Sequence, residues 1–247
     1  MATEASPRTL VIACGALARE LLAITRINGL DNVTVECLPA ALHNRPSEIP
    51  AAVRARIRRA RGQHVAAQPA ADDLSAKPAD PVDLATWADP ELRFDRVFVG
   101  YADCGTGGLL DRVCEEEGVE RLPGAHCYEF FATAPRFAEL QDHELGSFYL
   151  TDFLVKHFDR VVWQGLGIED HPELLPMYFG NYTRLVYLAQ TNDASLVADA
   201  ERAAEKLGLD LTVVPSGYGE LETSVVHLAA QPTPAKPTPV HVKQHER

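Results

Sequence analysis

The sequence has no apolar run that approaches the roughly 20 residues needed to cross a bilayer as a helix. Basic residues are also few, 23 against 35 acidic ones, which gives a formal net charge of -12. Such a charge repels phosphate backbones and anionic lipid surfaces. We therefore expect a protein that binds neither nucleic acid nor membranes. The first eight residues lack the basic-then-apolar layout of a secretion signal, so we also expect a cytoplasmic location.

Cysteine is sparse, and its spacing is irregular. The chain has five cysteines: Cys14, Cys37, Cys104, Cys114 and Cys127. An odd number in a reducing compartment disfavours a disulfide framework. No CxxC pair is present, so any metal ligands would have to come from separate loops. The thiols are therefore core residues, metal ligands or reactive groups.

Apolar residues form short runs, each followed by a small polar loop and then by a helical pattern. The three clearest runs are residues 9–13, 96–100 and 184–189. Strands that alternate with helices are typical of parallel sheets covered on both faces. The sequence therefore predicts an α/β fold, with parallel sheets and flanking helices built from repeated strand–loop–helix blocks.

Further patterns complete the expected order of elements, among them an amphipathic stretch at 144–158 that is long enough for a helix. They predict strands at 33–38, 120–122, 159–164, 211–214 and 225–228, and helices at 48–61, 144–158 and 171–182. We expect residues 8–230 to form a single α/β domain, with two small sub-domains as the alternative. Residues 62–90 and 231–247 are rich in Pro and poor in groups that could anchor a core. They are expected to be a mobile insertion and a disordered tail.

Three of the cysteines share a local pattern. Cys14 and Cys104 each follow a predicted strand and precede a glycine, and Cys127 follows a Pro-Gly turn. Loops at the carboxyl edge of a parallel sheet are where such folds bind ligands. Backbone amides in these loops, and at the helix starts behind them, lower a thiol pKa and favour thiolate. We expect these three cysteines to be metal ligands, the alternative being small buried residues at a crowded sheet edge.

The residues leave the metal undecided. Three thiolates can hold one zinc ion and leave a position open for water or substrate. They can equally hold three irons of a [4Fe-4S] cluster and leave the fourth iron free. Cys37 lies within a predicted strand and Cys114 lies in the middle of a predicted helix, so both are expected to be core residues.

His43 and Glu129 are the candidate catalytic side chains. His43 lies in a loop at a strand end, and imidazole titrates near neutral pH. Glu129 lies two residues beyond Cys127 and would point the same way on an extended backbone. His126 adjoins Cys127 and is a further candidate acid, base or ligand. The alternative for each is an ordinary loop or helix-start residue.

The loop 101–108 ends in glycines directly before a predicted helix. Gly105, Thr106 and Gly107 would expose backbone amides there and are the candidate cofactor-binding residues. Asp103 is a candidate base in the same loop. The Gly-Lys-Ser/Thr ending of a Walker motif is missing, so a nucleotide is not specifically indicated.

Five segments carry a resemblance to a known family: ACGALARELL, LPAALHNRP, YADCGTGGLLD, LPGAHCYEFF and LTDFLVKHFDRVVWQGLGIED. Together they resemble a prokaryotic family catalogued as a domain of unknown function, DUF1638, over residues 8 to 230 without 62–90. The resemblance implies family cysteines at Cys14, Cys104 and Cys127. Genes of this family often lie near corrinoid methyltransferase genes for methylated amines, which implies a place in one-carbon metabolism.

The layout is also similar to quinolinate synthase, which brings three cysteines from three α/β blocks to one iron–sulfur cluster. Here the third block offers Gln190-Thr191-Asn192 in place of a cysteine, so Cys127 would have to serve instead. Fold analogy alone does not carry function.

Three functions remain open from the sequence. The leading hypothesis is a metalloprotein with a three-cysteine zinc or iron–sulfur site that acts on a small molecule in one-carbon or methylated-amine metabolism. The second is a non-catalytic accessory or metal-delivery protein with a corrinoid protein or methyltransferase as its partner. The third is a metal-free module that binds a small molecule. Whether the chain is an enzyme stays undecided.

Overall fold

The computed structural model describes residues 7–62 and 94–231. The insertion expected at 62–90 and the tail expected at 231–247 lie outside the described residues, apart from Gly62 and Gln231. Gln231 accepts hydrogen bonds from the Arg96 guanidinium through both its backbone and its side-chain oxygen. Within the described ranges, no helix combines the length and apolar character needed to span a membrane.

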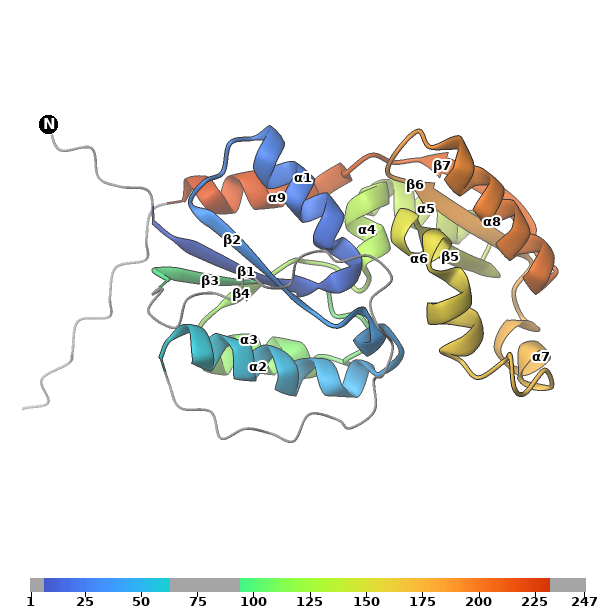
Figure 1. Cartoon of the computed structure of the whole chain (residues 1–247), viewed down its shortest axis with the longest axis horizontal. Coiled ribbons are helices and arrows are strands. Elements are labelled where there is room, and N and C mark those ends of the chain that lie inside the picture. Colours follow the sequence, from blue (N-terminus) through green and yellow to red (C-terminus); the bar gives the residue numbers. More distant parts are fainter. Residues whose placement is uncertain (1–6, 63–93, 232–247) are drawn as a thin grey trace, which may run out of the picture.

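The first sheet is parallel throughout and has its strands in the order β2-β1-β3-β4. The strands are β1 (Thr9–Cys14), β2 (Val33–Leu38), β3 (Arg96–Gly100) and β4 (Glu120–Arg121). The central strand β1 is buried almost to its end, because helices cover both faces of the sheet. Figure 1 shows α1 (Ala18–Ile27) and α9 (Gly219–Ala230) on one face, and α2 (Ile49–Ala60) and α3 (Leu109–Glu117) on the other.

The second sheet is smaller and also parallel, in the order β5-β6-β7. The strands are β5 (Ser147–Thr151), β6 (Arg184–Ala189) and β7 (Asp210–Pro215). One face packs against α6 (Asp152–Lys156), α8 (Ala194–Leu207) and the region of α7 (Leu174–Phe179). The other packs against α4 (Cys127–Ala132) and α5 (Ala134–His143).

One apolar core joins the two sheets through α4. It contains side chains of β1, α1, α4, α5, β5, β6 and α9, among them Val11, Leu21, Phe131, Tyr149, Val186 and Val225. The chain returns from β7 to the first sheet to form α9. Gly219 begins this helix at a φ of +52°, where an added Cβ would lie 2.2 Å from the Phe130 carbonyl oxygen. Only glycine permits so close an approach of α9 to α4.

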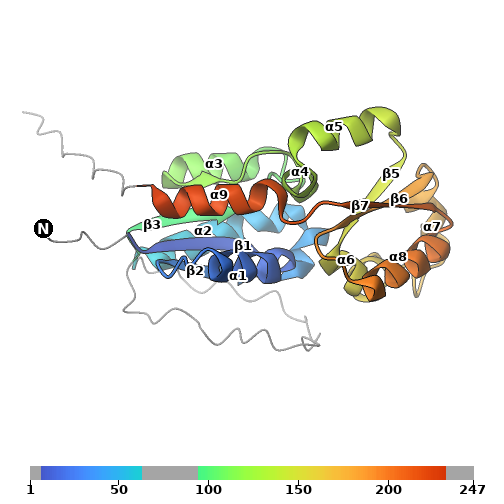
Figure 2. The same cartoon turned by 90° about the horizontal axis from the view of Figure 1, so that it is seen from above.

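The carboxyl ends of the two sheets face each other (Figures 1 and 2). The short helix η1 (Gly15–Leu17), which directly follows β1, contacts α6, which directly follows β5. A second bridge joins η2 (Ala40–Asn44) to η4 (Asp159–Gln164), because the Asn44 Nδ2 donates to the Val161 carbonyl at 2.8 Å. The loops at the carboxyl ends of both sheets, the edge at which open α/β folds bind ligands, therefore meet at one junction.

The expected α/β class, with parallel sheets and flanking helices, is confirmed. Three element predictions are wrong. The helix expected at 144–158 is the strand β5 followed by the short helix α6, because a strand buried on both faces shows no alternation to mark it. The strand expected at 159–164 is helical. The strand expected at 225–228 lies within α9, whose buried residues Leu221, Val225 and Leu228 follow helical spacing.

Candidate functional site

Two of the three cysteines are joined by the loops that carry them. The Asp103 N–H donates to the Gly124 carbonyl at 3.1 Å, and the Cys104 N–H donates to the Ala125 carbonyl at 2.9 Å. These bonds extend the first sheet past β4 and lay the two loops side by side. Cys127 then begins α4, with its backbone N–H near enough to the Cys104 thiol to lower the pKa of that thiol. Cys127 therefore lies close to Cys104.

Cys14 joins them from the end of β1. Its Sγ accepts a hydrogen bond from the Ala16 N–H at 3.5 Å and so caps η1. Burial, and after it the neighbouring Cys14, raise the pKa of Cys104 to about 12. Burial also raises the pKa of Cys127 well above its usual range, with Cys104 and then Cys14 adding to the rise. Because such effects act over short distances, the three thiols lie in one neighbourhood.

The direction of these pKa shifts corrects one expectation. We expected backbone amides to favour thiolate, and they do lower the pKa of Cys14 through Ala16, but burial outweighs them and the net pKa is raised. The metal-free thiols are therefore protonated at neutral pH. In the described residues, no three His, Cys, Asp or Glu side chains are already placed to hold one metal ion.

Cys104 has a strained backbone. Its φ is +51°, in the left-handed region that residues with a Cβ rarely adopt. The loop that contains it needs left-handed conformations at Gly105, Gly107 and Gly108 as well. A glycine at 104 would relieve the strain at no steric cost. The position therefore holds a thiol where the backbone alone would favour glycine.

The hydroxyl of Tyr101 lies beside the Cys14 thiol. Burial and then Cys14 raise the pKa of this tyrosine far above its usual range. The side chain is only 2% exposed, and among the described residues its hydroxyl has no hydrogen-bond partner of full geometry. A buried hydroxyl of this kind usually finds a partner, so it is free to serve one that arrives with a ligand.

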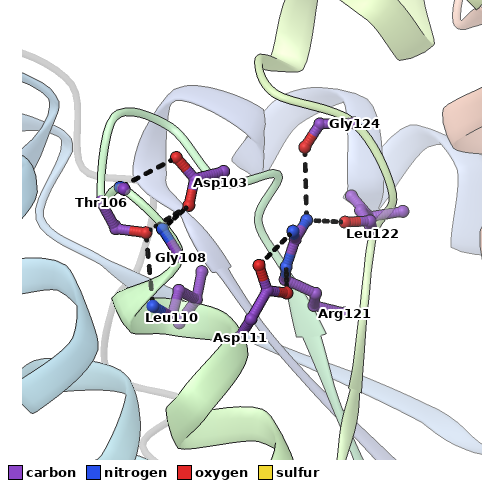
Figure 3. A network of polar contacts seen from close by, with 9 residues as sticks. Asp103, Thr106, Gly108, Leu110, Asp111, Arg121, Leu122 and Gly124 are labelled. Atoms are coloured by element: carbon purple, nitrogen blue, oxygen red, sulfur yellow. Dashed lines mark hydrogen bonds and ion pairs between the residues drawn. The ribbon is translucent and has the colours of Figure 1, made fainter.

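The amides expected to cradle a cofactor have a different partner in the structure. The Asp103 carboxylate accepts hydrogen bonds from the Thr106 hydroxyl at 2.6 Å, the Gly108 N–H at 2.9 Å and the Gly107 N–H at 3.1 Å (Figure 3). Burial alone would raise the pKa of Asp103, but these bonds outweigh it and lower the pKa. Binding of a cofactor at Gly105, Thr106 and Gly107 stays a prediction, and it would require the Asp103 carboxylate to move.

Arg121 fixes the turn that leads to Cys127. Its guanidinium binds both oxygens of Asp111, at 2.6 and 3.0 Å, and donates to the Leu122 carbonyl at 2.6 Å and the Gly124 carbonyl at 3.3 Å (Figure 3). Asp111 lies in α3, so the guanidinium ties this helix to the turn. A bidentate pair of this kind holds its geometry well. Arg121 is therefore a positioning residue for the cysteine loops.

His43 lies in η2, on the same side of the molecule as His126. Many protein atoms surround its ring although water still reaches it, and this desolvation, followed by repulsion from His126, lowers the pKa of His43. His43 is therefore neutral at pH 7 and can accept a proton. His126 is exposed, directly precedes Cys127, and lies 6.1 Å from the Tyr128 ring centroid.

The reasoning that placed Glu129 on the same side as Cys127 is wrong. Residues 127–132 are helical, and side chains two positions apart point to different sides of a helix. Glu129 instead turns back, and its Oε2 accepts a hydrogen bond from the Ala125 N–H at 2.8 Å. Its carboxylate holds the turn before Cys127. The catalytic role of Glu129 stays a prediction.

The two cysteines expected in the core occupy different settings. Cys114 is buried in the cluster between α2, α3 and the first sheet. Cys37 is only half-buried. Burial, followed by Cys14, Glu36 and Glu20, raises its pKa to about 12. Cys37 therefore lies close to the three-cysteine neighbourhood. Its position one residue before the end of β2 was the sequence signal that could have indicated this.

Glu20 was missed by the sequence reasoning. It lies on the buried side of α1, is 6% exposed, and its Oε2 has no hydrogen-bond partner among the described residues. The pKa of Glu20 is raised to about 7, because burial and then Asp152 of the second sheet outweigh its own backbone N–H and Arg19, which lower the pKa. A glutamate at a helix position otherwise occupied by Leu and Ile was the available signal.

The second sheet places a polar network opposite the cysteines, which the sequence reasoning also missed. Asp152 directly follows β5 and is 5% exposed. Its Oδ1 accepts hydrogen bonds from the Tyr187 hydroxyl at 2.8 Å and the Gln190 N–H at 2.9 Å, and its Oδ2 accepts one from the Thr191 hydroxyl at 2.6 Å. The Gln190 side chain accepts the Asp152 N–H at 2.7 Å in return. The carboxylate is thus held rigidly.

Comparison with known proteins identifies one family. Residues 37–225 match the family described as "Protein of unknown function (DUF1638)". The match covers well over half of the chain and contains Cys37, Cys104 and Cys127, whereas Cys14 precedes it. No curated protein and no solved structure matches the chain.

Proposed function

The chain belongs to the DUF1638 family, and on that premise we propose that Cys14, Cys104 and Cys127 bind a zinc ion or a [4Fe-4S] cluster at the junction of the two sheets. The observation that carries the proposal is their convergence: three segments far apart in sequence bring three thiols together at the carboxyl edge of the first sheet. A core-packing role would not require the strained backbone at Cys104.

The donor set suits a soft metal. Thiolates bind zinc and iron–sulfur clusters, and three of them leave one coordination position for water or substrate. Binding would displace the three thiol protons, since the metal lowers a thiol pKa far more than burial raises it.

Groups around the thiols could serve the chemistry of a bound small molecule. The Tyr101 hydroxyl lies beside Cys14, has no hydrogen-bond partner of full geometry among the described residues, and could donate to a ligand atom. His43 is neutral at pH 7 and could accept a proton. In our proposal the metal supplies Lewis-acid character, and these side chains orient the molecule or move its proton.

The setting that we propose is one-carbon or methylated-amine metabolism, as the family resemblance implies. A substrate-converting role and an accessory or metal-delivery role for a corrinoid methyltransferase partner both use the same three ligands. The two differ in what the open position meets, a small molecule or the acceptor site of a partner protein.

Metal content tests the ligand assignment. Protein purified anaerobically should carry about one zinc or about four irons per chain, and visible absorption separates the two because zinc is colourless. Cys104→Ser should lose most of the metal, since serine is a far weaker ligand for a soft metal. Cys114→Ser should keep it, because Cys114 packs between α2 and α3. Metal-free wild-type protein, or equal metal in both variants, would refute the proposal.

A further inference from the structure

A groove with a cavity volume of about 460 Å³ lies between α8 and the segment that leads from α6 into η4. Figure 1 shows α8 beside α6 on the second sheet. Residues 155–160 form one side of the groove, and one face of α8 forms the other. The floor is apolar, because Val155, Phe158 and Ala203 are almost wholly buried there. Pockets for small molecules have volumes of roughly 300–1,000 Å³, so this groove is large enough for one.

The sides of the groove carry more positive than negative charge. The cationic residues that line it are Lys156, Arg160, Arg202 and Lys206, and the acidic ones are Asp159 and Asp199. Four cations therefore face two carboxylates, although the whole chain has a formal net charge of -12. A hollow lined by an excess of one charge concentrates ligands of the opposite sign. The groove is therefore suited to an anion.

Ion pairs inside the groove account for only part of its charge. Arg202 pairs with Asp199 one helical turn away on α8. The Lys206 Nζ lies 2.7 Å from the Asp159 Oδ1 and 4.2 Å from the centroid of the Trp163 ring. Each carboxylate thus has one cation. Arg160 has no ion-pair partner among the described residues, so its guanidinium is available to a ligand.

The turn that carries Arg160 is unusual. Helix η4 is a π-helix, in which the wider spacing of the hydrogen bonds makes each turn broader than in an α-helix. Such turns occur often at functional sites. Here the turn brings Asp159 and Arg160 to the groove, while Val161 and Val162 stay buried in the core of the second sheet.

We propose that this groove binds the phosphate group of a small molecule, with the Arg160 and Arg202 guanidinium groups as its donors. A phosphate dianion matches the excess of two positive charges, and a guanidinium can bind two phosphate oxygens at once. Arg202 can take part because its side chain is 70% exposed, and an exposed ion pair is weak. The uncharged part of the molecule would rest on the apolar floor, against Val155 and Phe158.

The groove is separate from the three thiols. It begins at the end of α6, whereas Asp152, at the start of that helix, belongs to the edge that meets the first sheet. None of the described residues that line the groove is a cysteine. The inference therefore goes beyond the proposed function and does not depend on a metal. Cys104→Ser should bind phosphate as the wild type does.

Ligand-observed NMR of the full chain with phenyl phosphate tests the inference, with benzyl alcohol as the neutral control. We expect saturation transfer to phenyl phosphate and none to benzyl alcohol, with a dissociation constant in the millimolar range for so small a probe. Inorganic phosphate should compete. Arg160→Gln should weaken binding about tenfold or more. Arg136→Gln removes the same charge from an exposed pair on α5 and should leave binding unchanged.

A variant of opposite sign separates the charge of the groove from a general loss of structure. Asp159→Asn removes a carboxylate from the same turn and releases Lys206 from its ion pair. We therefore expect phenyl phosphate to bind about threefold or more tightly to this variant. Damage to the fold would weaken binding in both variants, whereas the proposal requires the two changes to be opposite.

The outcomes that would overturn the inference are distinct. It fails if phenyl phosphate does not bind the wild type, if Arg160→Gln binds equally well, or if binding is lost in Cys104→Ser. If Arg160→Gln does not fold, Arg202→Gln, on the exposed side of α8, must weaken binding instead. Sedimentation with vesicles that contain phosphatidic acid covers the other source of phosphate. Binding to those vesicles that depends on Arg160 would overturn the small molecule in favour of a lipid headgroup.

Discussion

The two sheet edges that meet at the junction are built in opposite ways. The edge of the second sheet is a closed network in which Asp152, Tyr187, Gln190 and Thr191 satisfy one another. The edge of the first sheet is held mainly by backbone bonds between loops, and its side chains are thiols with raised pKa values. A satisfied network rigidifies a fold, whereas unmet groups cost stability and are retained for another use.

Two buried polar groups on the first-sheet side of the junction lack a hydrogen bond of full geometry among the described residues, the Tyr101 hydroxyl and the Glu20 Oε2, and Cys104 has a left-handed backbone. The second sheet has one such group, the Tyr149 hydroxyl in β5. The second sheet shows none of these features at Asp152. The comparison indicates that the edge of the second sheet is a side-chain network held by hydrogen bonds, whereas the edge of the first sheet carries the ionisable groups with raised pKa values, the thiols and Glu20.

The largest loss of stability should follow from removing the Asp152 carboxylate from the network of the second sheet. Asp152→Ala removes the acceptor of two buried donors, the Tyr187 hydroxyl and the Gln190 N–H, and each unmet buried donor costs roughly 1–3 kcal/mol. We expect the free energy of unfolding to fall by about 3–5 kcal/mol, measured by urea denaturation. Asp193→Ala, at the exposed start of α8, should cost clearly less. Equal losses would show that the Asp152 network is not the stabilising feature of this edge.

The next effect concerns Glu20 and pH. The raised pKa means that the folded state of the metal-free protein holds the Glu20 proton up to about pH 7, whereas the unfolded chain releases it near pH 4.5. The stability associated with this proton is present below pH 4.5 and is lost as pH rises to 7. A shift of this size corresponds to about 3 kcal/mol.

Glu20→Gln should remove that dependence. We expect the variant to be more stable than the wild type at pH 8 and to approach it near pH 4.5, in urea titrations across this range on metal-free protein. Glu139→Gln, on the exposed face of α5, should follow the wild type at every pH. A wild-type stability that rises between pH 4.5 and 7 in step with the Glu20→Gln variant would contradict the assigned proton.

The sequence predicted the strands that lie at the centre of each sheet and missed the one that begins the second sheet. The central strands, at 9–13 and 184–189, are runs of apolar residues followed by turn residues, and local pattern is enough to identify them. Strand β5 lacks such punctuation, because α6 follows it without a loop. The turn chemistry that separates a strand from a helix is absent there.

The candidate site was predictable only for residues that follow a clear strand. Cys14 and Cys104 are marked by their strands and glycines, whereas Asp152 was assigned to the interior of a helix and so drew no attention. Glu20 is buried because elements distant in sequence pack against α1. A local sequence pattern does not indicate such contacts. The expected thiolate character failed for the same reason, because burial depends on the whole fold.

A smaller loss of stability should follow from releasing the turn before Cys127, which Arg121 holds at the edge of the first sheet. Arg121→Met removes the bidentate pair with Asp111 and the bonds to the turn before Cys127. Because Asp111 is partly exposed, we expect a loss of about 1–2 kcal/mol, which lowers the melting temperature by a few degrees. Metal content should fall as well. As the control, Arg136→Met breaks the exposed ion pair with Glu139 and should change neither the melting temperature nor the metal content. If Arg121→Met kept its full metal content, Arg121 would not be a positioning residue for the thiols.

The smallest effect isolates backbone strain from thiol chemistry by comparing Cys104 with Cys14. Cys104 has a φ of +51°, whereas Cys14 has a φ of -68° with an extended ψ. In the left-handed region glycine is favoured over alanine by about 1 kcal/mol, and elsewhere alanine is favoured because it loses less entropy on folding. Cys104→Gly should therefore be more stable than Cys104→Ala, and Cys14→Ala more stable than Cys14→Gly, in thermal melts of metal-free protein. The same order at both positions would mean that Cys104 carries no strain, and the left-handed backbone would then cease to distinguish a retained thiol from ordinary packing.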